Sequence, residues 1–155
     1  LILRDFDRQP FSRNMVLDYR QAEKRAREAL DEYSIKTSGK SGIKTPVKLM
    51  SGGNQQKVIL SREISEEAGL IVASQPTRGL DIGATRFVHE TLLRQRDAGR
   101  CVLLISADLD EILGVSDRVA VMYEGRIIGI LNRDEADVHK IGLLMGGIAK
   151  EAADE

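Results

Sequence analysis

Short apolar runs that alternate with helical patterns in the second half of the chain constrain its fold most strongly. Residues 70–73 and 101–105 are apolar runs of strand length, and residues 82–98 between them carry apolar side chains at helical spacing. A short helix over 109–113 and a hairpin follow. This order of strands and helices predicts an α/β fold with a parallel sheet. Because the strands of such a sheet are covered on both faces, we expect both apolar runs, and Cys101 with them, to be buried.

The first half of the chain is predicted to be largely helical. Residues 18–33 place apolar side chains on one helical face and charges on the other, and a second helix is expected from Ser51 to about residues 67–69. The other expected elements are an extended lead-in or short strand over 1–7, loops over 10–14 and 37–45, hairpin strands over 119–123 and 126–130, and a last helix over 134–145. The predicted domains are a helical subdomain with its lead-in over 1–68, the C-terminal part of an α/β core over 69–148, and a frayed tail over 149–155.

The segment that begins at Ser51 is a candidate phosphate contact. Ser51 is predicted to be an N-cap, and Gly52 and Gly53 follow it in the sequence. Two glycines weaken a helix start, but they leave its first N–H groups open to a ligand. A helix N-terminus with free N–H groups and a hydroxyl binds anions. The same residues also fit a flexible loop ahead of a capped helix.

Composition excludes several classes of function. The 155 residues include 23 basic and 24 acidic side chains, for a net charge of -1, which argues against a nucleic-acid partner bound by bulk charge. A single cysteine excludes an internal disulfide framework. His89 and His139 lack partners at metal-ligand spacing, so we assign no metal site to the protein side chains.

Three stretches together resemble ATP-binding cassette (ABC) transporter ATPases. Residues 49–58, Leu-Met-Ser-Gly-Gly-Asn-Gln-Gln-Lys-Val, resemble the signature motif of that family. Residues 76–81, Pro-Thr-Arg-Gly-Leu-Asp, resemble the turn and D-loop that follow its Walker B strand, and residues 116–125 also fit. The resemblance covers nearly the whole chain. It is strongest to the C-terminal part of the second cassette in the ATP-binding proteins of simple-sugar and nucleoside importers.

This resemblance implies a partial ABC ATPase cassette, in which a helical subdomain precedes a mostly parallel sheet flanked by helices. In the family, ATP and Mg²⁺ bind between two cassettes, and the signature of one cassette closes the site built by the P-loop of the other. Asp81 would couple the two sites across the dimer interface. The residues that the resemblance places at nucleotide sites are Ser51, Gly52, Gly53, Asn54, Gln55, Ser74 and Asp81.

The sequence departs from the family pattern at four points. No Gly-x-x-x-x-Gly-Lys-Ser/Thr motif occurs in it. The family places this motif upstream of Leu1, so we expect a C-terminal part of a cassette that does not hydrolyse ATP by itself. Ser74 replaces the Walker B Asp, Gln75 replaces the following Glu, and Ala107 replaces the switch His. A hydroxyl holds hydrated Mg²⁺ weakly, and an amide cannot accept a proton from water. We therefore expect this cassette's own site to bind or turn over nucleotide poorly.

The resemblance favours an importer subunit for a simple sugar or nucleoside, with an intact signature and a degenerate site of its own. It implies a second cassette, transmembrane permease subunits and, indirectly, an extracytoplasmic solute-binding protein as partners. The expected location is the cytoplasmic face of the bacterial plasma membrane, as a peripheral protein. A non-transport ABC ATPase and a non-catalytic cassette that only dimerises are the alternatives. The solute cannot be inferred, because solute contacts lie in the other subunits.

Overall fold

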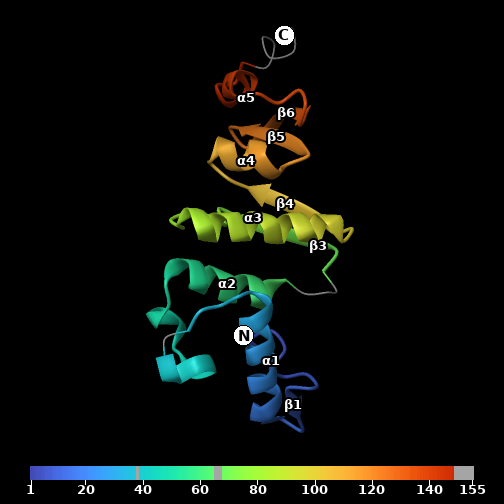
Figure 1. Cartoon of the computed structure of the whole chain (residues 1–155). Helices are drawn as coiled ribbons and strands as arrows, with labels where there is room; N and C mark the ends of the chain where they lie inside the picture. Colours follow the sequence, from blue (N-terminus) through green and yellow to red (C-terminus); the bar gives the residue numbers. More distant parts are fainter. Residues whose placement is uncertain (38, 65–67, 149–155) are drawn as a thin grey trace. The chain divides into compact units, whose positions relative to one another are not determined.

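Two compact units make up the part of the chain that the computed structural model describes, residues 1–37, 39–64 and 68–148. The first unit contains residues 1–71 and 76–102, and the second contains residues 72–75 and 103 onward. Figure 1 labels their helices and strands. Within the described ranges, no helix combines the length and the apolar character needed to cross a membrane.

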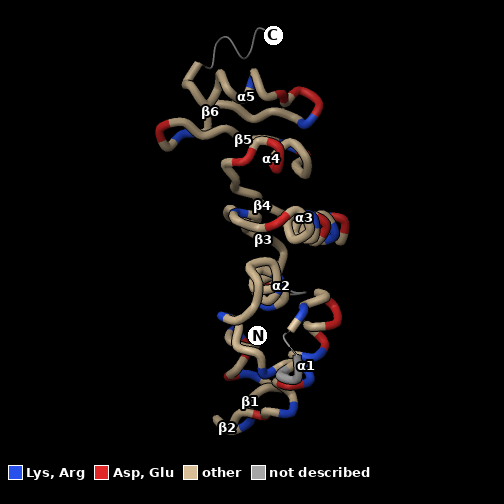
Figure 2. Tube along the Cα trace, turned by 60° about the vertical axis from the view of Figure 1, so that its left-hand side comes forward, with Lys and Arg blue, Asp and Glu red and all other residues tan. Residues whose placement is uncertain are grey.

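The first unit is mainly helical (Figure 1). Its elements are the antiparallel hairpin β1 (Ser12–Arg13) and β2 (Val16–Leu17), the helix α1 (Tyr19–Glu32), the 3₁₀ turns η1 (Gly39–Lys44) and η2 (Val47–Leu49), and the helices α2 (Gly52–Glu63) and α3 (Ile82–Asp97). Figure 2 shows both signs of charge along α1, as the predicted solvated face requires.

Phe87 of α3 joins the three long helices of the first unit. The ring of Tyr33, at the end of α1, meets the Phe87 ring edge-on with centroids 6.4 Å apart. Lys57 of α2 lies over the same ring, with its Nζ 4.4 Å from the centroid. Val88 and Leu92 of α3 are also buried. Phe87 therefore contacts side chains from the end of α1 and from α2.

Side-chain caps fix where the helices begin. Asp18, Ser51, Asp81, Asp108 and Asp137 each accept a hydrogen bond from a backbone N–H in the first turn of the helix that follows. Short oxygen-bearing side chains at this position satisfy N–H groups that have no intrahelical acceptor. The caps confirm the predicted starts of four helices. They correct the fifth, because α5 (Val138–Met145) begins after Asp137 and not at residue 134.

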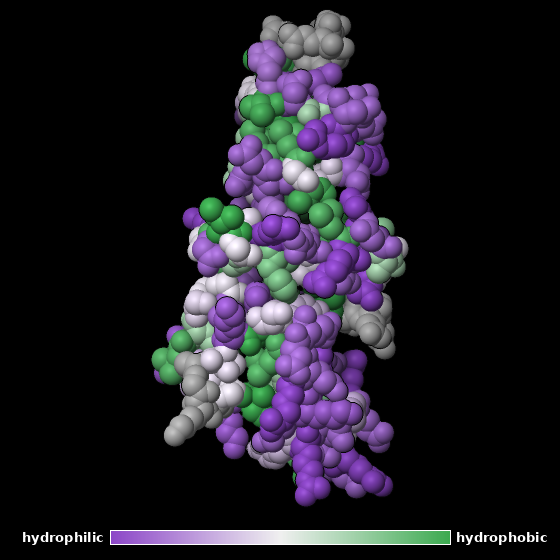
Figure 3. Space-filling model, viewed as in Figure 1, coloured by the Kyte–Doolittle hydropathy of each residue, from purple (hydrophilic) through white to green (hydrophobic). Residues whose placement is uncertain are grey.

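The strands β3 (Leu70–Ser74) and β4 (Cys101–Ile105) pair with each other. Their starts are joined by the bond from Cys101 N–H to Gly69 O (3.0 Å) and their ends by the bond from Gln75 N–H to Ile105 O (2.7 Å), so they run parallel. The predicted burial of both strands is wrong, because exposed and less exposed residues alternate along them. Cys101 is exposed as well. The described residues leave one apolar face of this pair uncovered. Figure 3 shows hydrophobic side chains, in green, reaching the surface among hydrophilic ones.

The second unit is built on an antiparallel hairpin, β5 (Arg118–Tyr123) and β6 (Arg126–Asn132), with α4 (Leu109–Val115) and α5. A two-residue turn connects the strands. Its residues Glu124 and Gly125 have φ angles of 45° and 77°, as a type I′ turn requires. The buried core consists of Val119, Val121, Leu131, Ala136, Ile141 and Leu144. The sequence correctly predicted this hairpin and the helix that covers it.

Several local predictions need correction. Residues 3–7 form turns, where a short strand or an extended lead-in over 1–7 was predicted, and a short hairpin begins inside the predicted loop over 10–14. The 3₁₀ turn η1 occupies most of the predicted loop over 37–45. Helix α2 ends at Glu63, before the predicted end, and residues 65–67 lie outside the described ranges, as does the tail over 149–155.

The α/β class is confirmed, but the strand pairing differs from one mostly parallel sheet. The described strands form three two-stranded sheets, of which only β3–β4 is parallel. The other two sheets are hairpins, whose short turns permit antiparallel pairing alone.

Candidate functional site

Ser51 and the two glycines after it form an open helix start. Ser51 is exposed and is the predicted N-cap of α2, with Gly52 and Gly53 as the first helical residues. A Cβ on Gly52 would meet only Leu80 Cδ2, at 4.0 Å, so this side of the first turn is open. The N–H groups of a first helical turn have no intrahelical acceptor, and the helix dipole places partial positive charge there. The arrangement fits a phosphate oxygen.

Asp81, the predicted D-loop residue, lies beside this helix start within the same unit. Asp81 caps α3, where its Oδ1 accepts a bond from Ala84 N–H (2.8 Å). A Cβ on Gly53 would lie 2.8 Å from Ala84 Cβ and 3.9 Å from Asp81 Oδ2. Gly53 is therefore needed for α2 to approach α3 this closely. We call Ser51, Gly52, Gly53 and Asp81 the signature edge; the sequence predicted its members but not their contact.

The side-chain amides of Asn54 and Gln55 bond within the chain. Asn54 Oδ1 accepts a bond from Lys36 N–H (2.9 Å), and Asn54 Nδ2 donates to Ser51 Oγ (3.0 Å). Gln55 Nε2 donates to Met50 O (2.9 Å). These bonds fix the backbone on both sides of Ser51. Direct contact of these two amides with nucleotide stays a prediction.

Ser74, Gln75 and Ala107, which we call the strand-end group, belong to the second unit. Ser74 ends β3, and Ala107 follows the neighbouring strand β4. Gln75 has a φ of 47°, in the left-handed region that side chains other than glycine rarely adopt. The bond from its N–H to Ile105 O holds this conformation. As predicted, these residues therefore lie at the carboxyl ends of two strands, and the two strands are neighbours in a parallel pair.

The chemistry available to the strand-end group is limited. Its side chains are a hydroxyl, an amide and a methyl group, none of which carries charge or exchanges protons near neutral pH. Within the residues that the structure describes, three or more His, Cys, Asp or Glu side chains nowhere gather to hold a metal ion. The neutral Ser74 hydroxyl is a poor partner for hydrated Mg²⁺. The residues present do not fit a complete Mg²⁺ site here.

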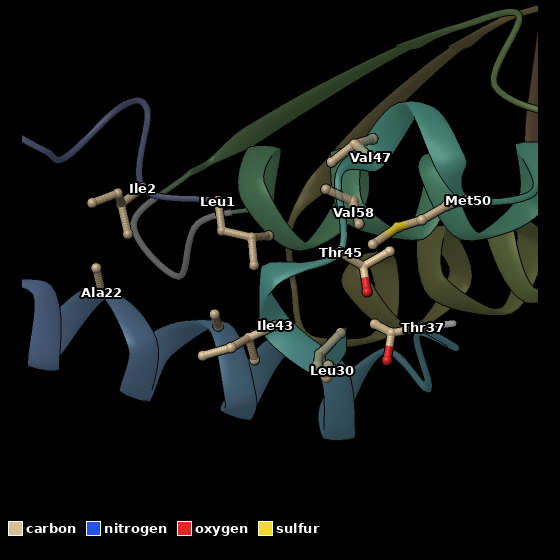
Figure 4. Close-up of a pocket in the computed structure, with 12 residues that line it drawn as sticks. Leu1, Ile2, Ala22, Leu30, Thr37, Ile43, Thr45, Val47, Met50 and Val58 are labelled. Atoms are coloured by element: carbon tan, nitrogen blue, oxygen red, sulfur yellow. The ribbon is translucent and has the colours of Figure 1, made fainter. Parts of the chain in front are cut away.

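A pocket is lined by residues of α1, the 3₁₀ turns and α2, close to the segment around Ser51 (Figure 4). Its volume is about 220 Å³, and Met50 and Val58 connect it to the segment around Ser51. The lining is mostly apolar. The Thr45 hydroxyl is buried there and has no partner among the described atoms. Without cationic lining, this pocket does not suit a phosphate, so the exposed signature edge is the better candidate. The pocket could not be predicted from the sequence, because its lining residues come from several segments that are far apart in the chain.

Comparison with known proteins shows that the chain is similar to segments of import ATP-binding proteins. No protein-family model matches it. It is 44% identical over 153 residues to the guanosine import ATP-binding protein NupO of Bacillus subtilis (strain 168), which covers 99% of this chain and 29% of that protein. It is 42% identical to the nucleoside import ATP-binding protein NupA of Lactococcus lactis subsp. cremoris (strain MG1363), over 95% of this chain and 28% of NupA.

A ribose importer protein is similar too. The ribose import ATP-binding protein RbsA of Clostridium perfringens (strain SM101 / Type A) is 47% identical over 122 residues, 76% of this chain and 24% of RbsA. The matched regions cover 24% to 29% of the length of these relatives.

Solved structures show the same fold. The ATP-binding cassette MJ0796, in a dimeric post-hydrolysis state bound to ADP and Pi, matches with a TM-score of 0.62 and 21% identity over 79% of this chain and 52% of that chain. The cassette MJ1267 matches with a TM-score of 0.65 and 21% identity, over 83% of this chain and 49% of its own. At this identity, the likeness establishes the fold alone.

Proposed function

We propose that this chain supplies its signature edge to an ATP site built by another cassette. The chain is homologous to one segment of the sugar and nucleoside import ATP-binding proteins, and it folds as part of an ABC ATPase cassette. The observation that carries this proposal is the open helix start at Ser51 and Gly52. It offers a hydroxyl and first-turn N–H groups that have no intrahelical acceptor, and a Cβ on Gly52 would meet only Leu80 Cδ2, at 4.0 Å.

The chain's own strand-end group would do little chemistry. ATP hydrolysis in this family depends on a carboxylate near the Mg²⁺, a second carboxylate near the attacking water and a switch imidazole. Ser74, Gln75 and Ala107 stand at those positions, and none of them can do the same work. The proposed division of labour is one working ATP site that uses this signature and one degenerate site.

ATP and Mg²⁺ would bind in the complete pair of cassettes. The partner cassette would contribute the P-loop and the Walker B carboxylates that hold Mg²⁺, while the first turn of α2 would contact the terminal phosphate. Asp81, beside Gly53, would place the D-loop at the same interface and link the two sites. When bound, Mg²⁺ would neutralise charge that develops on the phosphate oxygens.

The assembly would be an importer for a simple sugar or a nucleoside. Two permease subunits would dock on the cassettes near the helical subdomain, at the cytoplasmic face of the membrane. An extracytoplasmic binding protein would deliver solute to them. The proposed subdomain boundaries, 1–68 and 69–148, assign the signature helix to the first part and the strand ends to the second.

The decisive experiment compares ATP hydrolysis by the complete importer with and without Gly52→Asp. A carboxylate at this open position would repel the phosphate, and the rate should fall by about a hundredfold, as it does when a preorganised donor is lost. Gly114→Asp is the matched control, because Gly114 is exposed on α4 and no described atom lies within 4 Å of a Cβ built there.

An unchanged rate for Gly52→Asp would contradict the proposal. It would favour the second candidate function, a non-catalytic cassette that only dimerises, which the three losses in the strand-end group also support. Co-purification with permease subunits would distinguish an importer from a non-transport ABC ATPase, which should instead sediment with ribosomes or bind DNA.

A further inference from the structure

We propose that Asn54 is a positioning residue that makes the Ser51 hydroxyl an obligatory hydrogen-bond donor, so that this position accepts a phosphate oxygen and rejects a donor group. This inference rests on the proposed function. It adds a role for a residue whose side-chain amide bonds to the Lys36 N–H and to Ser51 Oγ.

The orientation of the Asn54 amide follows from its partners. The Lys36 backbone N–H lies 2.9 Å from one end of the amide, and a backbone N–H can only donate. That end must be the oxygen Oδ1. The other end, Nδ2, then faces Ser51 Oγ at 3.0 Å and donates to it.

The Ser51 oxygen receives a second bond from the same residue. Asn54 N–H reaches Ser51 Oγ at 3.4 Å as the ordinary N-cap bond. A serine hydroxyl has two acceptor lone pairs and one proton. Both lone pairs are therefore engaged by N–H groups, to which the hydroxyl cannot donate. The proton remains available for an acceptor outside the helix, such as a phosphate oxygen.

The segment that holds Asn54 is anchored independently of it. Lys57 Nζ donates to Ser34 O (3.0 Å), which ties α2 to the chain just before Lys36. Ile35 between them is buried, and its N–H bonds to Leu30 O (2.9 Å). The Lys36 N–H thus has a fixed position. It determines the orientation of the Asn54 amide, and the amide does not determine the position of the N–H.

The substitution Asn54→Asp separates the two functions of the amide. Aspartate keeps an oxygen for Lys36 N–H but presents a second oxygen to Ser51, which would draw the hydroxyl proton inward. We expect kcat for ATP hydrolysis by the complete importer to fall about tenfold or more. Gln56→Glu is the matched control, since it makes the same amide-to-carboxylate change two residues further along α2. Added charge alone acts on bound substrate and transition state alike, so the control should raise KM and leave kcat within about twofold.

Two further measurements complete the test. The double variant Ser51→Ala with Asn54→Asp should be no slower than Ser51→Ala, because Asn54 acts through that hydroxyl. Hydrogen exchange of the Lys36 backbone amide should stay slow in Asn54→Asp and become faster in Asn54→Ala. This result would show that Asn54→Asp keeps its fold and its hydrogen bond to Lys36 N–H.

A kcat for Asn54→Asp equal to that of Gln56→Glu, beside a collapse in Ser51→Ala, would overturn this inference and leave the proposed function standing. Additive losses in the double variant would also overturn it. An unchanged rate in Ser51→Ala would overturn the proposed function and this inference together.

Discussion

The signature edge and the strand-end group both lie where the backbone leaves a regular element, yet they differ in what holds them. At the signature edge, Ser51 and Asp81 are helix caps, and the proposed recognition groups are backbone N–H groups and a hydroxyl. The strand-end group consists of neutral side chains beside a strained Gln75 backbone. Phosphate recognition can share residues with helix capping, because both use the same donors and acceptors. A working Mg²⁺ site and proton transfer need carboxylate or imidazole side chains, which the strand-end group lacks.

The same serine-to-alanine change at the two regions should have very different effects on ATP hydrolysis by the complete importer. Ser51→Ala removes a donor aimed at developing charge and should slow turnover about a hundredfold. Ser74→Ala removes a hydroxyl from the degenerate site and should change turnover less than about twofold. Circular dichroism on both variants checks that loss of the N-cap has not unfolded α2, since such a loss destabilises a helix by about 1 kcal/mol. Equal losses at the two serines would contradict the comparison.

Glycine-to-alanine changes test the contact inside the signature edge. Gly53→Ala places a Cβ 2.8 Å from Ala84 Cβ, so α2 and α3 must separate, and the free energy of unfolding should drop by about 1–3 kcal/mol. A Cβ on Gly52 would make only an ordinary van der Waals contact with Leu80 Cδ2, at 4.0 Å, so Gly52→Ala should change this free energy by less than about 0.5 kcal/mol. Urea unfolding of both variants measures the difference. Similar midpoints would show that the two helices do not pack this closely.

A substitution at Gln75 tests whether strain distinguishes the strand-end group. Gln75→Gly removes the Cβ at a φ of 47° and should raise the free energy of unfolding by about 1 kcal/mol. Ser74→Gly is the control, because Ser74 lies in a strand, where glycine is destabilising. Thermal unfolding would show opposite shifts for the two variants. A lower stability for Gln75→Gly would mean that the glutamine side chain contributes more than its backbone conformation costs.

Alkaline pH should weaken the first unit, which carries the signature edge, through Tyr33. Burial, and secondarily the Glu32 carboxylate, raise the pKa of the Tyr33 phenol above its ordinary value. The unfolded chain then loses this proton first, so the stabilising contribution is complete below about pH 10 and is lost as pH rises through the folded pKa. Tyr33→Phe should reduce the alkaline loss in urea unfolding between about pH 9 and 11, while Tyr19→Phe, at an exposed position, should leave it in place. If the alkaline loss of stability persisted in Tyr33→Phe, it would have to come from a titratable group other than Tyr33.

Local chemistry in the sequence predicted most of the helix starts and the late hairpin. Ser51 capped its helix as expected, because an N-cap depends on residues within one turn of each other. Burial was predicted less well. Cys101 and the strand it begins were expected inside a covered sheet, and they are exposed because burial depends on which distant segments cover a face.

The sequence by itself determined which side chains are available: a stretch over 49–58 that resembles the ABC signature, and a strand-end group without carboxylate or imidazole. Those are properties of residue identity at fixed positions, and folding does not change them. The tertiary structure alone decided that Gly53 lies against Ala84 and that the Asn54 amide turns toward Lys36. Both contacts join residues far apart in the chain, where periodicity and capping rules carry no information about which surfaces meet.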